Sequence, residues 1–179
     1  MDYKNVIDFW FHEIDPSFWF KKDDNFDDRI RNNFLQIYED VLNGRTKDWR
    51  RSAEGRLAEI IVLDQFSRNM FRGSAKAFQA DALALNLAQQ AVEAGDDMSL
   101  PVQQRSFIYM PYMHSENRAA HEIAVKLFSQ PGLENNLKFE LLHKKIIDRF
   151  GRYPHRNEVL GRISSNEEIE FLKTNGSSF

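Results

Sequence analysis

Polar side chains that could carry chemistry gather in three separate stretches of the chain. The first stretch, LDQFSRNMFRG, carries Asp64, Gln65, Arg68, Asn69 and Arg72. The second, YMPYMHSE, carries Tyr109, His114, Ser115 and Glu116, and the third, RFGRYPHRN, carries Arg149, Arg152, His155, Arg156 and Asn157. Carboxylates and histidines exchange protons, and guanidinium groups bind phosphate or carboxylate in bidentate fashion. Together these residues form a candidate polar centre that could bind an anion, and none of them is assigned a catalytic role.

Each stretch also has a purely structural interpretation. At about 100° per residue, Asp64 and Arg68 fall on the same helical stripe as the apolar residues around Leu57. Because buried charges are rarely left without a partner, the one-turn spacing predicts an internal Asp64–Arg68 ion pair. Ser115 before Glu116 is typical of an ordinary helix start, and a structural role is the favoured interpretation of His114. The arginines of the third stretch fit an anion site and internal salt bridges equally well.

Several familiar sites are excluded by their missing parts. The chain has no cysteine, which removes disulfides, thiolate metal sites and a cysteine nucleophile. The sequence HEIAV from His121 begins like a zinc-protease helix but lacks the second histidine. No phosphate-binding loop and no nucleophile elbow is present. We therefore expect no metal and no cofactor.

Composition sets limits on the class of protein and on its partners. The 179 residues carry 24 Lys plus Arg against 27 Asp plus Glu, for a net charge of -3, which argues against nucleic acid as a partner. The start MDYKNVIDFW does not resemble a signal peptide, and no apolar run is long enough to span a membrane. We expect a cytoplasmic protein with no membrane association.

The elements that must position these residues are helices, because apolar residues recur at three and four and no strand pattern appears. The expected fold is all-α, with seven to eight helices in antiparallel pairs around one core, in a single domain over 1–179 with a frayed tail from about 174. The expected helices cover about 3–11, 24–42 after a cap at Asp23 or Asp24, 53–70 after a cap at Ser52, 75–94 after a cap at Ser74, 101–113, 116–130, 133–150 and 166–172. Pro101 should open the fifth helix, Pro111 should kink or end it just before His114, and Ser115 should cap the sixth.

The stretches LDQFSRNMFRG, YMPYMHSE and RFGRYPHRNEVLGR, preceded by the helix FDDRIRNNF, resemble an uncharacterised family of mainly bacterial proteins, the domain of unknown function nine-two-four. The resemblance spans nearly the whole chain. It implies a fold like tetratricopeptide repeats, a right-handed array of antiparallel helix pairs, and it implies no activity or catalytic residue. One departure is Ser67, where the family is expected to favour proline, and it bears on the helix geometry just before Arg68.

Two functions fit these observations. The first is a peptide- or protein-binding or scaffold module, whose helical array presents an apolar groove while the polar stretches fix the helices in register. The alternative is an enzyme or binder of a small anionic metabolite, held through the Asp64/Arg68, His114/Glu116 and Arg152/His155/Arg156 segments. Because no nucleophile or metal signature is present, the binding module is preferred over an enzyme.

Overall fold

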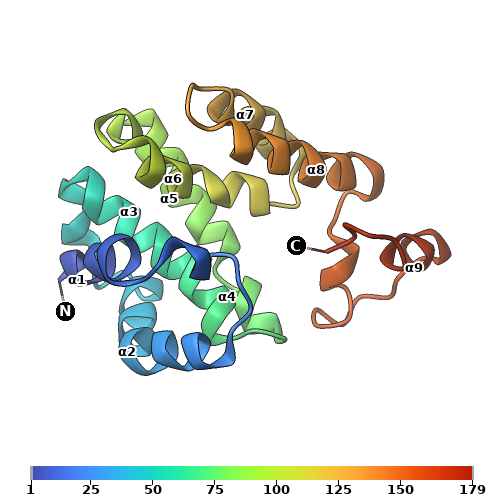
Figure 1. Ribbon diagram of the computed structural model, residues 1–179, viewed down its shortest axis with the longest axis horizontal. Helices are drawn as coiled ribbons and strands as arrows, with labels where there is room; N and C mark the ends of the chain where they lie inside the picture. Colours follow the sequence, from blue (N-terminus) through green and yellow to red (C-terminus); the bar gives the residue numbers. More distant parts are fainter. Residues whose placement is uncertain (1, 179) are drawn as a thin grey trace. The chain divides into compact units, whose positions relative to one another are not determined.

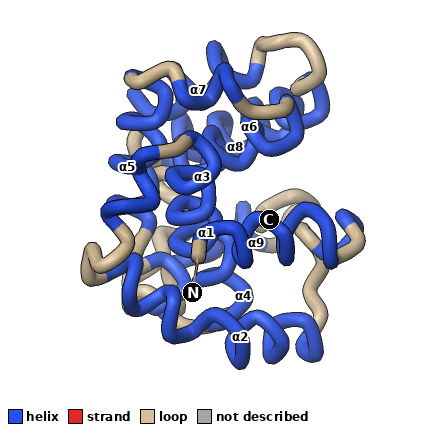
Figure 2. Tube along the Cα trace, turned by 90° about the vertical axis from the view of Figure 1, so that its left-hand side faces the viewer, coloured by secondary structure: helices blue, strands red, loops and turns tan. Residues whose placement is uncertain are grey.

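The computed structural model describes residues 2–178, and in this range the chain forms helices and connecting loops without any strand (Figure 2). The prediction of an all-α fold is confirmed. The α-helices, labelled in Figure 1, are α1 (Tyr3–Asp8), α2 (Asp24–Leu42), α3 (Ala53–Ile61), α4 (Ser67–Met70), α5 (Asp81–Glu93), α6 (Val102–His114), α7 (Arg118–Phe128), α8 (Glu134–Phe150) and α9 (Asn166–Leu172).

A π turn, Val62–Phe66, joins α3 to α4 without a break, so that the stretch 53–70 is one helical rod. With these two segments taken as one, residues 2–178 hold eight helices packed in pairs, as predicted. The pairs include α1 with α3, α3 with α5, α2 with α4, and α7 with α8. The right-handed array like tetratricopeptide repeats stays a prediction.

Contacts between residues divide the chain into two compact units. The first unit comprises Met1–Arg72 and Lys76–Pro111, and the second comprises Gly73–Ala75 and Tyr112–Phe179. Each unit is described by itself below. The expectation of a single domain over 1–179 stays a prediction.

The core of the first unit is rich in aromatic rings. Phe34 of α2 lies 4.7 Å from Phe66 and 4.8 Å from Phe9, measured between ring centroids. Trp10 packs edge-on against Phe66 at 5.4 Å. Phe9 and Trp10 belong to a π turn, Phe9–Glu13, which extends the first helix beyond α1. The tilted and edge-on geometries are those that aromatic pairs favour, so these rings fix how α1, α2 and the π turn before α4 pack together.

The start of the rod 53–70 depends on a close approach of backbone to backbone. Ser52 caps α3, as predicted, by accepting a hydrogen bond from the Gly55 N–H at 3.1 Å. A Cβ at Gly55 would lie 2.0 Å from the carbonyl oxygen of Trp49. Only glycine fits there, because the 3₁₀ turn Lys47–Arg51 lies directly against the first turn of α3.

The second unit is built on α7 and α8, which lie side by side (Figure 1). Gly151 ends α8 in the left-handed conformation with φ of 70°, as its position after Phe150 predicts. Tyr153 then turns into the core, where it packs with Ile146 and Ile147 and is fully buried. Ser165 and Glu168 form the predicted capping box at the start of α9.

Four predicted boundaries are wrong in detail. Residues 75–78 form a 3₁₀ turn, and α5 begins at Asp81. α6 begins at Val102, one residue after Pro101. It continues through Pro111 to His114, so the proline does not end the helix. Asn117 rather than Ser115 caps α7, because its side chain accepts from the Ala119 N–H at 2.9 Å.

Candidate functional site

The predicted Asp64–Arg68 pair is present in the first unit, at the π turn between α3 and α4. The carboxylate of Asp64 is 1% exposed and lies 3.3 Å from Nη1 of Arg68. The guanidinium of Arg68 also binds both carboxylate oxygens of Asp81, each at 3.1 Å. Asp81 is the first residue of α5, so one arginine ties the π turn to the next helix. The sequence interpretation did not include Asp81, which lies 13 positions away.

A second polar cluster joins the end of the rod to α2. Asp27 accepts a hydrogen bond from Asn69 Nδ2 at 2.7 Å and two from Arg72, at 2.5 and 2.9 Å. The hydrogen bond from Asp27 raises the pKa of Arg72, although burial opposes it. Asp27 was missed as a partner because it lies in α2, 45 positions before Arg72. Asn69 and Arg72 therefore hold α4 against α2.

The other two predicted site residues of the first unit bond to its own groups. Gln65 donates to Asp64 Oδ2 at 2.5 Å and lies 3.4 Å from the sulfur of Met110. Tyr109 donates its hydroxyl to Asp97 Oδ2 at 2.5 Å.

In the second unit, Glu116 connects the second and third stretches of the sequence. Its two carboxylate oxygens accept from the guanidinium of Arg162 at 2.7 and 2.9 Å, and Oε1 also accepts from the Tyr153 N–H at 2.8 Å. Burial by itself raises the pKa of Glu116, but Arg162 and the Tyr153 N–H together lower it below its usual range. Ser115 accepts at its Oγ from the Asn117 N–H at 3.1 Å.

Arg152 is held by a carboxylate of α9. Its Nε and Nη2 bind the two oxygens of Glu168 at 2.7 and 2.8 Å. The hydrogen bond from Arg152 lowers the pKa of Glu168 to about 2, against the opposing effect of burial, and the Ser165 N–H adds to the lowering. Glu168 thus caps its helix and neutralises Arg152 at the same time.

The remaining residues of the third stretch also have partners inside the unit. Arg149 donates to Glu167 at 2.8 Å and stacks on the Phe150 ring at 4.7 Å. Arg156 is buried with its guanidinium 4.5 Å from the Tyr153 ring. His155 lies 5.6 Å from the same ring, and Asn157 donates to Ser164 Oγ at 3.0 Å. These contacts support the internal interpretation of the arginine-rich loop over an anion site.

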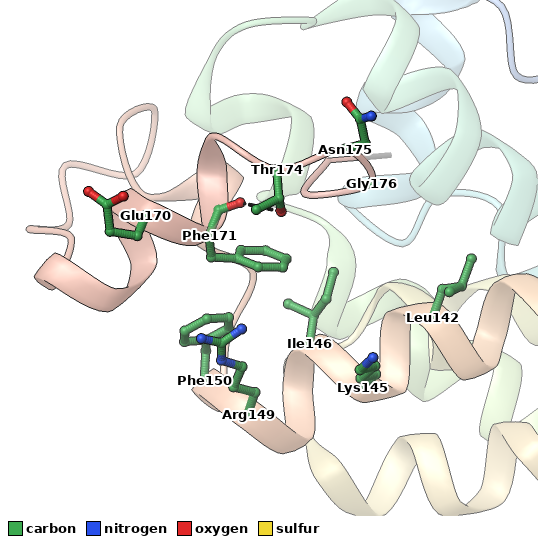
Figure 3. A pocket seen from close by; sticks show the side chains of 10 residues that line it. All are labelled: Leu142, Lys145, Ile146, Arg149, Phe150, Glu170, Phe171, Thr174, Asn175 and Gly176. Carbon is green, nitrogen blue, oxygen red and sulfur yellow. Dashed lines mark hydrogen bonds between the residues drawn. The ribbon is translucent and has the colours of Figure 1, made fainter.

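An apolar groove lies within the second unit, between α8 and the chain after α9 starts. We call it the α8 groove. It has a volume of about 450 Å³ and is lined by Leu142, Lys145, Ile146, Arg149, Phe150, Glu170, Phe171, Thr174, Asn175 and Gly176. Figure 3 shows Phe150 and Phe171 facing each other, with Ile146 and Leu142 following along α8. The groove includes part of the tail that was expected to fray from about residue 174, where the buried Ser177 donates to the Leu172 carbonyl at 3.2 Å.

Sequence reasoning missed this groove, although one signal of it was present. Leu142, Ile146 and Phe150 are spaced by four, which places them on one face of α8. The opposite wall comes from Phe171, whose ring lies 5.0 Å from that of Phe150. The approach of these two aromatic residues depends on the turn at Gly151 and the path of the loop that follows.

Two searches of the described residues return nothing. Between residues 2 and 178, no three His, Asp or Glu side chains come together as a metal site. No helix in the same range is long and apolar enough to span a bilayer.

Comparisons with known proteins give a family without a function. The model of a family of bacterial proteins of unknown function, DUF924, matches residues 6–176. The solved structure of ATU0120 from Agrobacterium tumefaciens, a protein of unknown function, is similar to this chain with a TM-score of 0.91 and 35% identity over 96% of each chain. No curated protein matches.

Proposed function

The chain belongs to the DUF924 family of bacterial proteins of unknown function, and we propose that it is a peptide-binding module. Its occupant would be a short acidic amphipathic segment of a partner protein, bound in the α8 groove. The observation that carries this proposal is the groove itself, an open apolar surface about 450 Å³ in volume with two cations along its edge.

The apolar face of the groove suits bulky side chains. Leu142 is 45% exposed, although it lies in the middle of a packed helix. Ile146 is buried at the base, and Phe150 and Phe171 form the deep end. A surface of this shape fits anchor residues spaced by three or four on a partner helix, which is a common mode of peptide recognition. The aromatic end would supply most of the binding energy.

The charges along the groove favour an acidic partner. Lys145 and Arg149 follow the same side of α8 one turn apart. Arg149 is bound to Glu167, whereas Lys145 is exposed and forms no ion pair with any residue from 2 to 178. Glu170, the acid that lines the opposite side, is bound to Lys173 at 2.6 Å. A carboxylate on the partner would therefore find a cation at Lys145.

The alternative, a small anionic metabolite held by the arginines, has less support. Arg68, Arg72, Arg152 and Arg162 each bind a carboxylate of the protein in bidentate fashion. An anion would have to displace these carboxylates, which would leave charges without partners.

The test is a displayed library of short random peptides selected on the intact protein, followed by affinity measurements on the enriched sequences. We expect enriched peptides to combine Asp or Glu with Leu, Ile or Phe. Leu142→Glu should weaken their binding about tenfold or more, since it places a charge on the apolar face. Lys145→Glu should weaken it through charge repulsion and by slowing association.

Matched controls lie on the same helix. Leu141→Glu changes a leucine that is 50% exposed but does not line the groove, and Lys138→Glu changes a lysine outside it. Both control variants should bind like the wild type. No enrichment, or affinities equally insensitive to Leu142→Glu and Lys145→Glu, would remove the basis of the proposal.

A further inference from the structure

Four of the five histidines of the chain gather around one buried tyrosine in the second unit. The Tyr153 ring lies 5.8 Å from His143, 6.4 Å from His121 and 5.6 Å from His155, and His114 lies 6.3 Å from His143. The fifth histidine, His12, is exposed and belongs to the first unit. This concentration of titratable rings in one core is absorbed by neither the family comparison nor the α8 groove.

His143 is held in its neutral form by its contacts. It is 6% exposed, and its Nδ1 lies 2.8 Å from the carbonyl oxygen of Phe139. A carbonyl oxygen only accepts, so Nδ1 carries the hydrogen. His114 from the end of α6, His121 from α7 and Arg156 from the loop after α8 all act on it as cations or potential cations. The environment therefore penalises a positive charge on His143 from three directions.

The nearest acid is engaged by another histidine. His121 and Glu140 are both fully buried, with Nδ1 of His121 at 2.7 Å from Oε1 of Glu140. Nε2 of His121 lies 2.8 Å from the Ser115 carbonyl, so it donates there. Burial raises the pKa of Glu140, although His121 opposes the change, which favours a protonated Glu140 that donates to Nδ1. Lys144 and Asp148, which act on Glu140 from its own helix, are paired with each other at 2.7 Å.

This cluster is continuous with the wall of the α8 groove. Tyr153 packs with Ile146 and Ile147, and Phe150 and Phe171 pack against this group. Ile146, Phe150 and Phe171 also line the groove. A loss of packing at Tyr153 would therefore remove the surface that forms the base of the groove.

We propose that the second unit is an acid-sensitive module, in which acidification favours opening of the histidine core and so dissolves the α8 groove. The device is the placement of His143 among His114, His121 and Arg156 beneath the groove wall. The inference concerns the stability of the unit and holds whether or not a peptide binds in the groove.

The direction of the effect follows from proton linkage. Burial and the neighbouring cations lower the pKa of His143 from 6.5 to about 3, although its bond to Phe139 opposes the change. Above pH 6.5 the folded and opened states are both neutral at this site, so the folded unit has its full stability. As the pH falls from 6.5 toward 3, the opened state takes up a proton that the folded state refuses, and stability is lost.

Hydrogen exchange of the intact protein, followed by mass spectrometry at about pH 7 and about pH 5, tests this. After correction for the chemical exchange rate, the opening equilibrium of α8 and residues 150–157 should rise about thirtyfold, the value for one group with an ordinary pKa of 6.5. Segments in α2 and α3 should change far less. The three tryptophans, Trp10, Trp19 and Trp49, all lie in the first unit, so their emission should stay constant between the two pH values.

His143→Asn removes the titration and keeps a donor near the position of Nδ1, so it should abolish most of the pH effect, whereas His12→Asn should leave it intact. A second measurement needs no variant: the imidazole carbon resonance of His143 in the wild type should keep its neutral position down to about pH 5. Equal corrected exchange at both pH values, a His143→Asn variant as acid-sensitive as the wild type, or a His143 resonance that titrates near neutrality would each overturn the proposal.

Discussion

Arg68 shows how a single side chain can resemble a ligand-binding residue and still serve the fold. Its guanidinium contacts the buried Asp64 and holds Asp81 with two hydrogen bonds, and Nη1 also donates to the backbone carbonyl of Asp64 at 2.7 Å. These contacts use the same bidentate geometry that would recognise an external carboxylate. The partner in this protein is the first residue of α5, so the recognition is internal.

Replacing Arg68 with alanine should therefore cost stability. Arg68→Ala leaves the carboxylate of Asp64 buried with one cation fewer, and we expect a loss of about 3 kcal/mol in the free energy of unfolding. Urea unfolding followed by tryptophan emission measures it, because the tryptophans share the first unit with Arg68. Arg51→Ala is the control, since the Arg51–Asp48 pair is more than 80% exposed on both sides. Unchanged unfolding of Arg68→Ala would contradict a stabilising role for this pair.

Residues close in sequence revealed their pairing, and distant partners did not. The one-turn spacing of Asp64 and Arg68 was enough to predict their contact, because helical geometry alone brings them together. Asp27, Asp81 and Glu168 lie on other helices, and their approach depends on tertiary packing. The histidine cluster was missed for the same reason, since its members come from α6, α7, α8 and the loop after α8.

At the scale of elements, the π turn Val62–Phe66 is the feature that departs most from a regular helix. It lies inside a helical rod, and both Asp64 and Gln65 belong to it. The N–H of the next residue, Ser67, is directed to the carbonyl of Gln65, outside the normal ladder of bonds to the residue four positions earlier. Ser67 has φ of -58°, a value that proline also adopts. A π turn of this kind is a common accompaniment of functional or strained positions in helices.

This geometry predicts an unusual tolerance. Ser67→Pro should change the free energy of unfolding by less than about 1 kcal/mol, because proline removes no bond of the regular ladder at this position. It would lose the hydroxyl bond to the Leu63 carbonyl, which measures 2.6 Å. Asn33→Pro, at an exposed position inside α2, is the control and should cost about 3 kcal/mol or more. Thermal unfolding of both variants decides the matter, and equal losses would show that residue 67 behaves as an ordinary helix interior.

Caps and stops were the elements best predicted from sequence. Ser52, Asp23 and Ser165 cap the helices they were expected to cap, because a cap depends on neighbours within three residues. The π turn was not predicted, since a fixed turn of about 100° per residue contains no such irregularity. Pro111 also misled the boundary prediction, because α6 accommodates it and continues to His114.

At the scale of the whole molecule, each unit offers a different kind of surface and core. The first unit combines an aromatic core with carboxylate–arginine clusters that hold α2, the rod 53–70 and α5. The second unit carries the α8 groove and the histidine core. On this view ligand binding belongs to the groove in the second unit, and the polar residues in both units stabilise the fold.

The most direct test of this view is a nuclear magnetic resonance titration of the intact, isotope-labelled protein with a peptide enriched on it. Shifts confined to the lining of the α8 groove, strongest at Ile146, Phe150 and Phe171, are the predicted result, with the guanidinium signals of Arg68, Arg72 and Arg152 unmoved. Shifts centred on those arginines, with the groove residues unchanged, would contradict the account and return the polar stretches to the position of a binding site.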